Sequence, residues 1–561
     1  MLTRTFFSLI ILVLFTFSTS IGASGDPVRA ENGMVVSASK LASDIGIEIL
    51  KKGGNAIDAA VATGFALAVA YPTAGNLGGG GFMVIHLADS LNTTIDFREK
   101  APKNAFRDMY LDSNGVYLPE LGREGFTSSG VPGSVEGLLY ALNHYGTMKI
   151  HEVIEPAIKL AEEGIVLEYR LAESISSNTN RFLEYPSSAK IFTKNGNPYE
   201  ENDTLIQKDL ARALQLISEN GRDGFYKGHV AKLIAEHSKK SGGFITEQDL
   251  ADYQCVERTP IYGYYKGFDI VTMGPPSSGG IAITQALNAL ENFNWEKSDW
   301  NSSEYIHTLV EILKRVYADR AEHLGDVDYY PVPVDWLTSK LYAQEIVTGI
   351  ADTATPSEKV NPGIPIPEES EETTHYSVVD KYGNAVSTTV TLNSSYGNKI
   401  VVEGAGFLMN NEMDDFSAKP GTPNQFGLLG SEANSIEPGK RMLSSMTPTI
   451  VLKQGKPYFV TGSPGGSTII TVVLQTILNV IDFEMDVEQT LYAPRIHHQW
   501  MPDKIYFEEY GLSKDVIENL ERRGHIMGNI RVLGRAEGIL IFDDYFTGTT
   551  DPRGYGKASG Y

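Results

Sequence analysis

The feature that most constrains this 561-residue sequence is a stretch with the pattern of a tight β-hairpin. Residues 375 to 380 and 384 to 392 are rich in Val, Thr and Tyr, which favour strands. Residues 381 to 383 between them form a three-residue loop with glycine at the left-handed position. Folding the strands about this loop places Thr391 across from Thr373, within one residue of register. Cross-strand threonines also stabilise ordinary sheets, so the pair indicates either packing or a functional contact.

The hairpin directly follows an acidic run from residue 356 to residue 372. This run contains four prolines and a cluster of glutamates at its end, but little apolar material. A segment of this composition cannot bury enough apolar surface to pack, so it should be solvated. It is either a simple loop or an accessible arm at which the chain is cut.

Cleavage between Glu372 and Thr373 would change the chemistry of Thr373. A threonine hydroxyl is a weak nucleophile that needs an adjacent base. An α-amine titrates near about 7.7 to 8.0 and can act as that base, whereas an amide nitrogen inside a chain cannot. One residue would then supply nucleophile and base, so processing and activation would be one event. The alternative is that residues 373 to 377 simply begin a strand.

Helix and strand patterns alternate through the rest of the chain. Apolar residues recur at helical spacing from 41 to 52, and Asn55 is placed to cap an alanine-rich helix that runs to residue 70. Further helices are predicted at 208 to 238, 303 to 321 and 469 to 480, strands at 82 to 86 and 94 to 97, and a hairpin at 262 to 273. This mixture predicts an α/β or α+β fold. One large domain is as compatible as several, because the interior has no linker and no repeat.

Charge and cysteine content exclude several kinds of function. The formal net charge of −23 argues against a nucleic-acid partner, whose phosphates require Lys and Arg. Cys255 is the single cysteine, so the chain has no intramolecular disulfide and no thiolate metal cluster. No zinc, calcium or phosphate-loop motif is complete, so neither a metal nor a cofactor is predicted.

Residues 1 to 24 have the pattern of a signal peptide. A basic residue, Arg4, precedes an apolar stretch from 6 to 17, and small residues suited to signal peptidase follow. The apolar stretch is shorter than the about 20 residues that span a bilayer. The protein is therefore predicted to be exported, to a periplasm or to the medium. An uncleaved amino-terminal anchor is the alternative.

Three polar segments in the carboxyl-terminal third could carry chemistry. Residues 410 to 415 group two asparagines with three carboxylates, which suits an ammonium ligand unless they form a solvated acidic loop. Residues 440 to 448 place two serines beside a turn. Residues 462 to 467, here the glycine loop, precede an apolar helix, and N–H groups at such a start can stabilise an oxyanion. His497 and His498 would point to opposite faces of a strand, which favours a structural role over a metal site.

Together these segments resemble the γ-glutamyltranspeptidase family over nearly the whole mature chain. The motifs that carry the resemblance are NLGGGGFM, DFREKAP, TTHYSVVDKYGNAVSTTVTLN, NNEMDDFSAKPG, KRMLSSMTPTIV, TGSPGGSTIIT, APRIHHQW and the carboxyl-terminal DPRG and SGY. The resemblance implies an α+β fold, the four-layer αββα sandwich of the N-terminal-nucleophile hydrolases. It also implies a precursor cut before Thr373 into a large subunit, residues 25 to 372, and a small subunit, residues 373 to 561, which together form one domain.

The resemblance further implies roles for the matching residues. Thr373 would attack the γ-amide carbonyl of a γ-glutamyl donor such as glutathione, and Thr391 would hold its hydroxyl. Gly465 and Gly466 would stabilise the oxyanion through their N–H groups. The glutamyl group would then pass to water, or to the amine of an amino acid or dipeptide. The donor's carboxylate cradle is matched by Arg98, Ser444 and Ser445, and its ammonium cradle by Asn393, Glu412 and Asp415.

Residues 423 to 436, here the lid segment, look like a loop that covers the pocket in many bacterial members of the family. Phe426 lies where the gating aromatic residue is often tyrosine. Phenylalanine cannot donate a hydroxyl hydrogen bond, so we expect looser closure, which bears on the balance between hydrolysis and transfer.

Two other functions fit parts of the pattern. An acylase or polyglutamate-processing enzyme on the same scaffold would act on donors that need not present a free α-amino acid, and the complete set of cradle residues argues against it. A secreted amino-acid-binding protein that never matures would remain one uncleaved, inactive chain.

We expect Thr373→Ala to block both cleavage and turnover, because it removes the hydroxyl that each reaction needs. Thr373→Ser keeps a hydroxyl and should retain part of each. Electrophoresis follows the cleavage, and chromophore release from a γ-glutamyl anilide follows turnover. A normally cleaved and active alanine variant would contradict the assignment.

Overall fold

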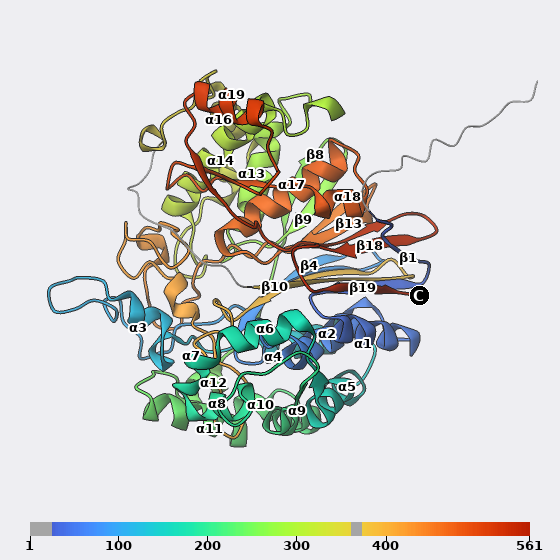
Figure 1. The fold of residues 1–561 in the computed structure, drawn as a ribbon, viewed down its shortest axis with the longest axis vertical. Helices are drawn as coiled ribbons and strands as arrows, with labels where there is room; N and C mark the ends of the chain where they lie inside the picture. The colour runs from blue at the N-terminus through green and yellow to red at the C-terminus, as the bar shows by residue number, and fades with distance from the viewer. Residues whose placement is uncertain (1–24, 361–372) are drawn as a thin grey trace, which may run out of the picture.

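The structure is a computed structural model that describes residues 25 to 360 and 373 to 561. Two seven-stranded antiparallel sheets face each other at its centre (Figure 1). The first sheet has, in spatial order, β1 (Val28–Ala30), β18 (Phe546–Thr550), β17 (Glu537–Ile541), β13 (Lys456–Gly462), β12 (Thr449–Lys453), β9 (Phe268–Thr272) and β8 (Ile261–Tyr265). The second has β19 (Lys557–Gly560), β2 (Gly33–Ser37), β10 (Thr374–Asp380), β11 (Ala385–Thr391), β3 (Gly80–His86), β4 (Asn92–Asp96) and β7 (Val256–Arg258).

Helices cover the outer face of each sheet (Figure 1). The second sheet is covered by α1 (Lys40–Lys51), α2 (Ala56–Ala70) and α4 (Ser134–Tyr145), with α5 (Ile150–Glu163) and α9 (Lys208–Asn220) outside them. The first sheet is covered by α13 (Gly279–Leu290), α17 (Ile469–Ile481) and α18 (Val487–Tyr492), and α14 (Ser303–His323) packs on α13. Each sheet forms a large apolar core with its helices. The described residues therefore have an α+β fold.

The remaining α-helices and strands of the described residues lie outside these main elements. They are α3 (Pro119–Arg123), α6 (Tyr169–Ser177), α7 (Thr179–Leu183), α8 (Pro186–Phe192), α10 (Asp223–Tyr226), α11 (Gly228–Lys240), α12 (Glu247–Asp252), α15 (Val334–Leu337), α16 (Lys340–Thr348), α19 (Lys514–Arg522), and the strands β5 (Ile165–Val166), β6 (Thr204–Leu205), β14 (Ile496–His497), β15 (Ile505–Phe507) and β16 (Met527–Ile530).

Helix α2 links the core to the central hairpin. All its side chains are buried, and its small alanines allow close packing. Asn55 caps it as predicted: its side chain accepts hydrogen bonds from the N–H groups of Ile57 and Asp58, and the Asp58 carboxylate accepts one from the Asn55 N–H. Asp380, at the end of β10, accepts a hydrogen bond from the Ala56 N–H at 2.8 Å. The start of α2 is thus bonded directly to the hairpin.

The predicted helices at 41 to 52, 303 to 321 and 469 to 480 and the hairpin at 262 to 273 are confirmed within a few residues. Residues 208 to 238 are helical as predicted, and they form three helices, α9, α10 and α11. Gly221 lies between α9 and α10, and Gly228 is the first residue of α11; their φ values are +59° and +65°. These left-handed values interrupt the helix, and glycine adopts them without strain.

The prediction that residues 356 to 372 cannot pack is wrong for the first part of this run. Ser357 and Val360 are buried. The Trp500 indole N–H donates to the Ser357 carbonyl at 2.8 Å, and the Ser357 N–H donates to Asp503 at 2.8 Å. Residues 361 to 372 lie outside the described residues, as does the predicted signal peptide. Of the helices that the structure describes, none has the length and apolar character to cross a bilayer.

The close approach of α1 and α2 requires glycine at position 46. A Cβ atom there would lie 2.5 Å from the Thr63 hydroxyl oxygen and 3.0 Å from Val35. We expect Gly46→Leu to lower the free energy of unfolding by about 1–3 kcal/mol, because overpacking forces the helices apart. Glu48→Leu on the exposed face of α1 is the matched control. Equal urea midpoints for the two variants would contradict this packing argument.

Candidate active site

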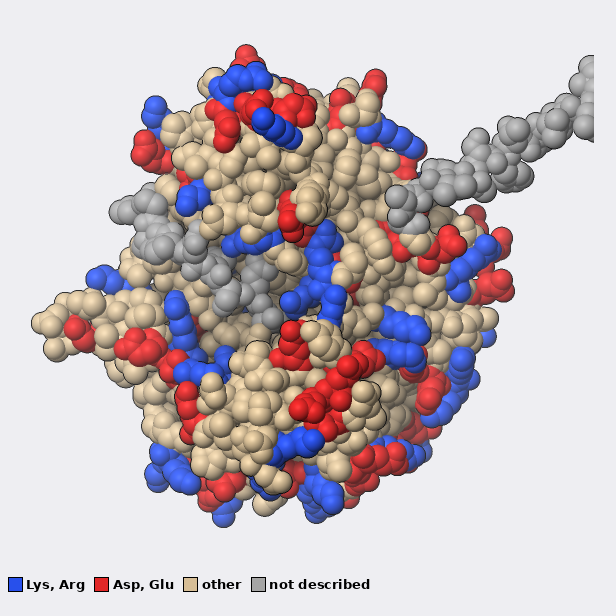
Figure 2. All heavy atoms as spheres, in the orientation of Figure 1, with Lys and Arg blue, Asp and Glu red and all other residues tan. Residues whose placement is uncertain are grey.

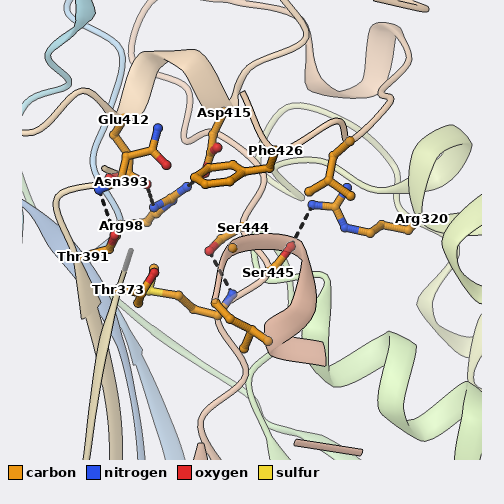
Figure 3. Close-up of a pocket in the computed structure, with 14 residues that line it drawn as sticks. Arg98, Arg320, Thr373, Thr391, Asn393, Glu412, Asp415, Phe426, Ser444 and Ser445 are labelled. Atoms are coloured by element: carbon orange, nitrogen blue, oxygen red, sulfur yellow. Dashed lines mark hydrogen bonds and ion pairs between the residues drawn. The ribbon is translucent and has the colours of Figure 1, made fainter. Parts of the chain in front are cut away.

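The hairpin brings Thr373 and Thr391 to the same pocket. Thr374 pairs with Val390, so continuing the register by one residue sets Thr373 opposite Thr391, as predicted. Gly383 in the connecting loop has φ of +95°, the left-handed value that the loop requires. Both threonines are buried, and their side chains lie together at one wall of the pocket (Figure 3).

The pocket gathers nearly all the residues that the sequence singled out. Its lining consists of Arg98, Arg320, Thr373, Thr391, Asn393, Glu412, Asp415, Phe426, Leu428, Ser444, Ser445, Met446, Gly466 and Ile469. Gly465 is the one predicted pocket residue that is absent from this lining, and it adjoins Gly466 in the chain. Residues from both halves of the sequence therefore form one site.

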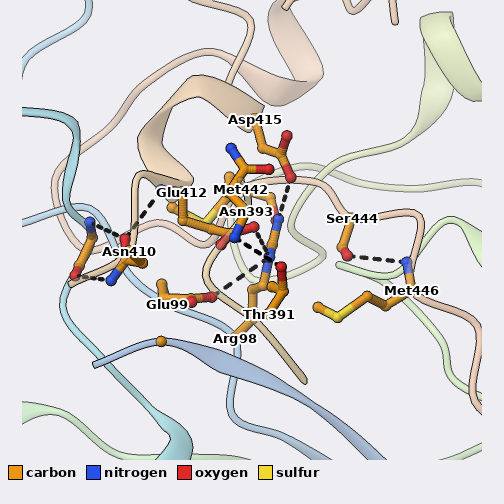
Figure 4. Close-up of polar contacts among 12 residues, drawn as sticks. Arg98, Glu99, Thr391, Asn393, Asn410, Glu412, Asp415, Met442, Ser444 and Met446 are labelled. Atoms are coloured by element: carbon orange, nitrogen blue, oxygen red, sulfur yellow. Dashed lines mark hydrogen bonds and ion pairs between the residues drawn. The ribbon is translucent and has the colours of Figure 1, made fainter. Parts of the chain in front are cut away.

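A buried ion cluster centred on Arg98 forms part of the pocket wall near Thr391 (Figure 4). The Arg98 guanidinium donates to the carboxylates of Glu412 and Asp415, the latter at 2.5 Å. Its Nη1 lies 3.5 Å from a carboxylate oxygen of Glu99. The backbone carbonyls of Met442 and Leu443 accept two further bonds from it, each at 3.3 Å. One cation thus faces three carboxylates.

Burial controls the charge of this cluster. It raises the pKa of Glu99 to about 7 and that of Asp415 to about 6, although Arg98 opposes both shifts. The pKa of Glu412 is raised for the same reason. Ionised, the three carboxylates carry more charge than Arg98 neutralises, so a second cation in the pocket would be stabilised.

The residues predicted to form a carboxylate cradle and an ammonium cradle are not two separate groups in the structure. Arg98 is bonded to Glu412 and Asp415, not to the serines. The Ser444 hydroxyl oxygen accepts a bond from the Met446 N–H at 3.2 Å. The Asn393 N–H donates to the Thr391 hydroxyl oxygen at 2.8 Å, and its side-chain amide donates to the Asn411 carbonyl at 2.9 Å. Arg98 and two of the residues predicted to bind the ammonium, Glu412 and Asp415, thus bond to one another.

The glycine loop and the lid segment meet above the threonines. Gly465 and Gly466 have φ of +136° and +50°, which favour glycine, and they connect β13 to α17. A Cβ atom on Gly466 would lie 2.7 Å from the Phe426 ring, so the ring packs directly on the loop. Phe426 is buried, and its N–H donates to the Asn424 side chain at 2.9 Å. The lid segment covers this side of the pocket.

Sequence reasoning missed Arg320 and gave no role to Glu99. Arg320 lies in α14, where a basic residue gave no local signal, yet it is buried. Its guanidinium donates to Ser445 at 3.2 Å (Figure 3) and to Ser278 at 2.9 Å. The signal for Glu99 was present, because it follows Arg98 in DFREKAP.

Comparison with known proteins identifies the family. Residues 42–561 match the family model for γ-glutamyltranspeptidase. The chain is 49% identical to a glutathione hydrolase proenzyme of Escherichia coli over 94% of this chain and 91% of that protein. A cephalosporin acylase of Bacillus halodurans is similar in structure, with a TM-score of 0.86, 26% identity and coverage of 98% and 99% of the two chains. A γ-glutamyltranspeptidase of Helicobacter pylori is 46% identical, with a TM-score of 0.58 and coverage of 62% and 98%. The chain therefore belongs to the γ-glutamyltranspeptidase family.

Proposed function

We propose that this protein is an exported γ-glutamyltranspeptidase and glutathione hydrolase that cuts itself between Glu372 and Thr373. The observation that carries the proposal is the pocket that Thr373 and Thr391 line together with the buried ion pairs of Arg98 with Glu412 and Asp415. Cleavage yields a large subunit, residues 25 to 372 after removal of the signal, and a small subunit, residues 373 to 561. The pair forms one four-layer αββα sandwich, in line with the helix-covered facing sheets.

The reaction begins at the threonine hydroxyl. Thr373 Oγ attacks the γ-amide carbonyl, its proton passes to the α-amine, and Thr391 orients the nucleophile. The N–H groups of Gly465 and Gly466 stabilise the oxyanion, a contribution worth roughly 10² to 10³ in rate for one donor. The C–N bond then breaks and the leaving amine takes the proton. Water, or the amine of an amino acid or dipeptide, attacks the resulting ester and regenerates Thr373.

The donor's α-carbon carries a carboxylate and an ammonium, and both must find partners when buried. The ammonium binds Asn393, Glu412 and Asp415, and the carboxylate binds Arg98, Ser444 and Ser445. A donor entering the pocket replaces part of the Arg98 contact with Glu412 and Asp415 by contacts of its own, so the charges remain compensated. The guanidinium also suits a carboxylate better than a lysine would, because it can donate two parallel bonds.

The proposed partners are small molecules: γ-glutamyl donors such as glutathione and amino acid or dipeptide acceptors. Acidic and basic side chains are interspersed over the face shown in Figure 2, a distribution that does not favour a nucleic-acid partner. The proposed chemistry draws on the chain's own side chains and backbone N–H groups.

The main alternative is an acylase on the same scaffold. The structural similarity to a cephalosporin acylase supports this alternative. An acylase donor such as a glutaryl amide lacks the ammonium group. Bound here, it would not supply the second cation that the three buried carboxylates can stabilise, at a cost in free energy.

We expect a γ-glutamyl anilide to be preferred over the glutaryl anilide by at least about 100-fold in kcat/KM, because only the former supplies the ammonium. The two donors are assayed side by side with the purified protein. Equal values would favour the acylase. Electrophoresis and amino-terminal sequencing of the smaller chain test maturation in the same sample; a single inactive chain would favour a binding protein.

The preference for the ammonium-bearing donor should depend on pH. Burial raises the pKa of Asp415 to about 6 and that of Glu99 to about 7, so these groups take up protons as the pH falls through this range. Protons then compete with the ammonium for the carboxylates. We expect the ratio of kcat/KM for the γ-glutamyl anilide to that for the glutaryl anilide to fall between about pH 8 and about pH 5. Titration of the Thr373 α-amine affects turnover of both donors equally, so it cancels in the ratio. A ratio independent of pH would contradict this mechanism.

A further inference from the structure

Gln499 connects the glycine loop to the lid segment. It follows β14 in the APRIHHQW motif, and its side chain is buried. Its carbonyl oxygen accepts a hydrogen bond from the Ser467 hydroxyl at 2.7 Å. Its amide nitrogen donates to the backbone carbonyl of Phe426 at 3.3 Å. One side chain therefore touches both segments that close over Thr373.

The orientation of the Gln499 amide follows from its neighbours. The Phe426 carbonyl can only accept, so the amide NH₂ faces it and the amide oxygen faces the other way. There the oxygen lies 2.8 Å from His497 Nε2, which therefore carries the hydrogen. His497 Nδ1 lies 2.9 Å from the Thr471 hydroxyl oxygen. Burial lowers the pKa of His497 well below its ordinary value, so the imidazole is neutral, as this arrangement needs.

The glycine loop is also bonded to α14 and packed against the lid segment. The Tyr317 hydroxyl, on α14, donates to the Ser467 carbonyl at 2.6 Å. The Phe426 ring packs on Gly466. In the residue before Phe426, the Gln425 N–H donates to Asp414 at 2.8 Å and its side chain accepts from Ser394 at 2.9 Å. Among its polar attachments, the lid segment thus bonds to Asp414 and Ser394 through Gln425, and to the glycine loop through Gln499.

We infer that Gln499 is a positioning residue that couples closure of the lid segment to the placement of the Gly466 N–H. Phe426 has no side-chain hydroxyl that could form a hydrogen bond across the pocket. Its backbone carbonyl instead accepts a hydrogen bond from Gln499 and so attaches the lid segment. When the lid segment moves away, the amide loses its acceptor, and the Ser467 contact that fixes the glycine loop is weakened. This inference rests on the proposed function in assigning an oxyanion to Gly466.

Gln499→Met tests the coupling, because methionine keeps the volume and removes every hydrogen bond. Gln207→Met is the matched control: Gln207 is also buried, and its amide donates to the Val69 carbonyl at 2.9 Å, away from the pocket lining. We expect both variants to mature into two chains. In Gln499→Met, kcat/KM for a γ-glutamyl anilide should fall about tenfold, and transfer to a dipeptide should fall relative to hydrolysis as water enters.

Limited chymotrypsin digestion measures how firmly the lid segment is attached, and this measurement does not depend on enzyme activity. Cleavage after Phe426 should be at least about fivefold faster in Gln499→Met than in wild type and unchanged in Gln207→Met. In a double-mutant cycle with Phe426→Ala, the two losses in kcat/KM should overlap rather than multiply.

Unchanged digestion of Gln499→Met, or fully multiplicative losses, would overturn the inference. An equal effect in Gln207→Met would overturn it too, because the effect would then be general loosening. If the wild type lacks γ-glutamyl activity, the proposed function fails, and digestion alone decides whether Gln499 holds the lid segment.

Discussion

The antiparallel pairing of β10 with β11 is the constraint on which the rest of this structure depends. Both strands are buried along their whole length, with β2 and β3 as outer neighbours in the sheet. A shift by one residue would turn every side chain to the other face. The same register that fills the core therefore sets Thr373 beside Thr391. Packing and chemistry share one determinant, and the α2 contact at Asp380 holds the other end of the hairpin.

The ion cluster around Arg98 is harder to explain by stability alone. Removing charges from water is costly, and apolar residues of similar size often stabilise a core as well as a buried ion pair does. An uneven cluster, with three carboxylates about one guanidinium, is understandable if the pocket must receive a ligand that carries both charges. Arg320, bonded to Ser445, extends the positive side of the pocket beyond Arg98.

Much of this architecture could be predicted because its signals are local. The hairpin loop has three residues, so its register follows from loop length, and the cap of α2 follows from Asn55. The contact of Arg98 with Glu412 joins residues 314 positions apart, and no local pattern records it. In the sequence, Arg320 has the pattern of a surface residue on a helix. Gln499 follows two histidines, and no local pattern assigns it a role. The membership of the pocket was largely predictable, but the bonds among its members were not.

The order of strands has a consequence for any break in the backbone after residue 372. In the second sheet, β2 lies between β19 and β10, and the adjoining β10 and β11 lie between β2 and β3. The first sheet likewise joins β1, β9 and β8 to strands that come after the break. Each of the two sheets would then contain strands from both resulting polypeptides. Separating the two polypeptides would break hydrogen bonds between neighbouring strands in both sheets. We therefore expect the cleaved molecule to stay associated as firmly as the uncleaved chain.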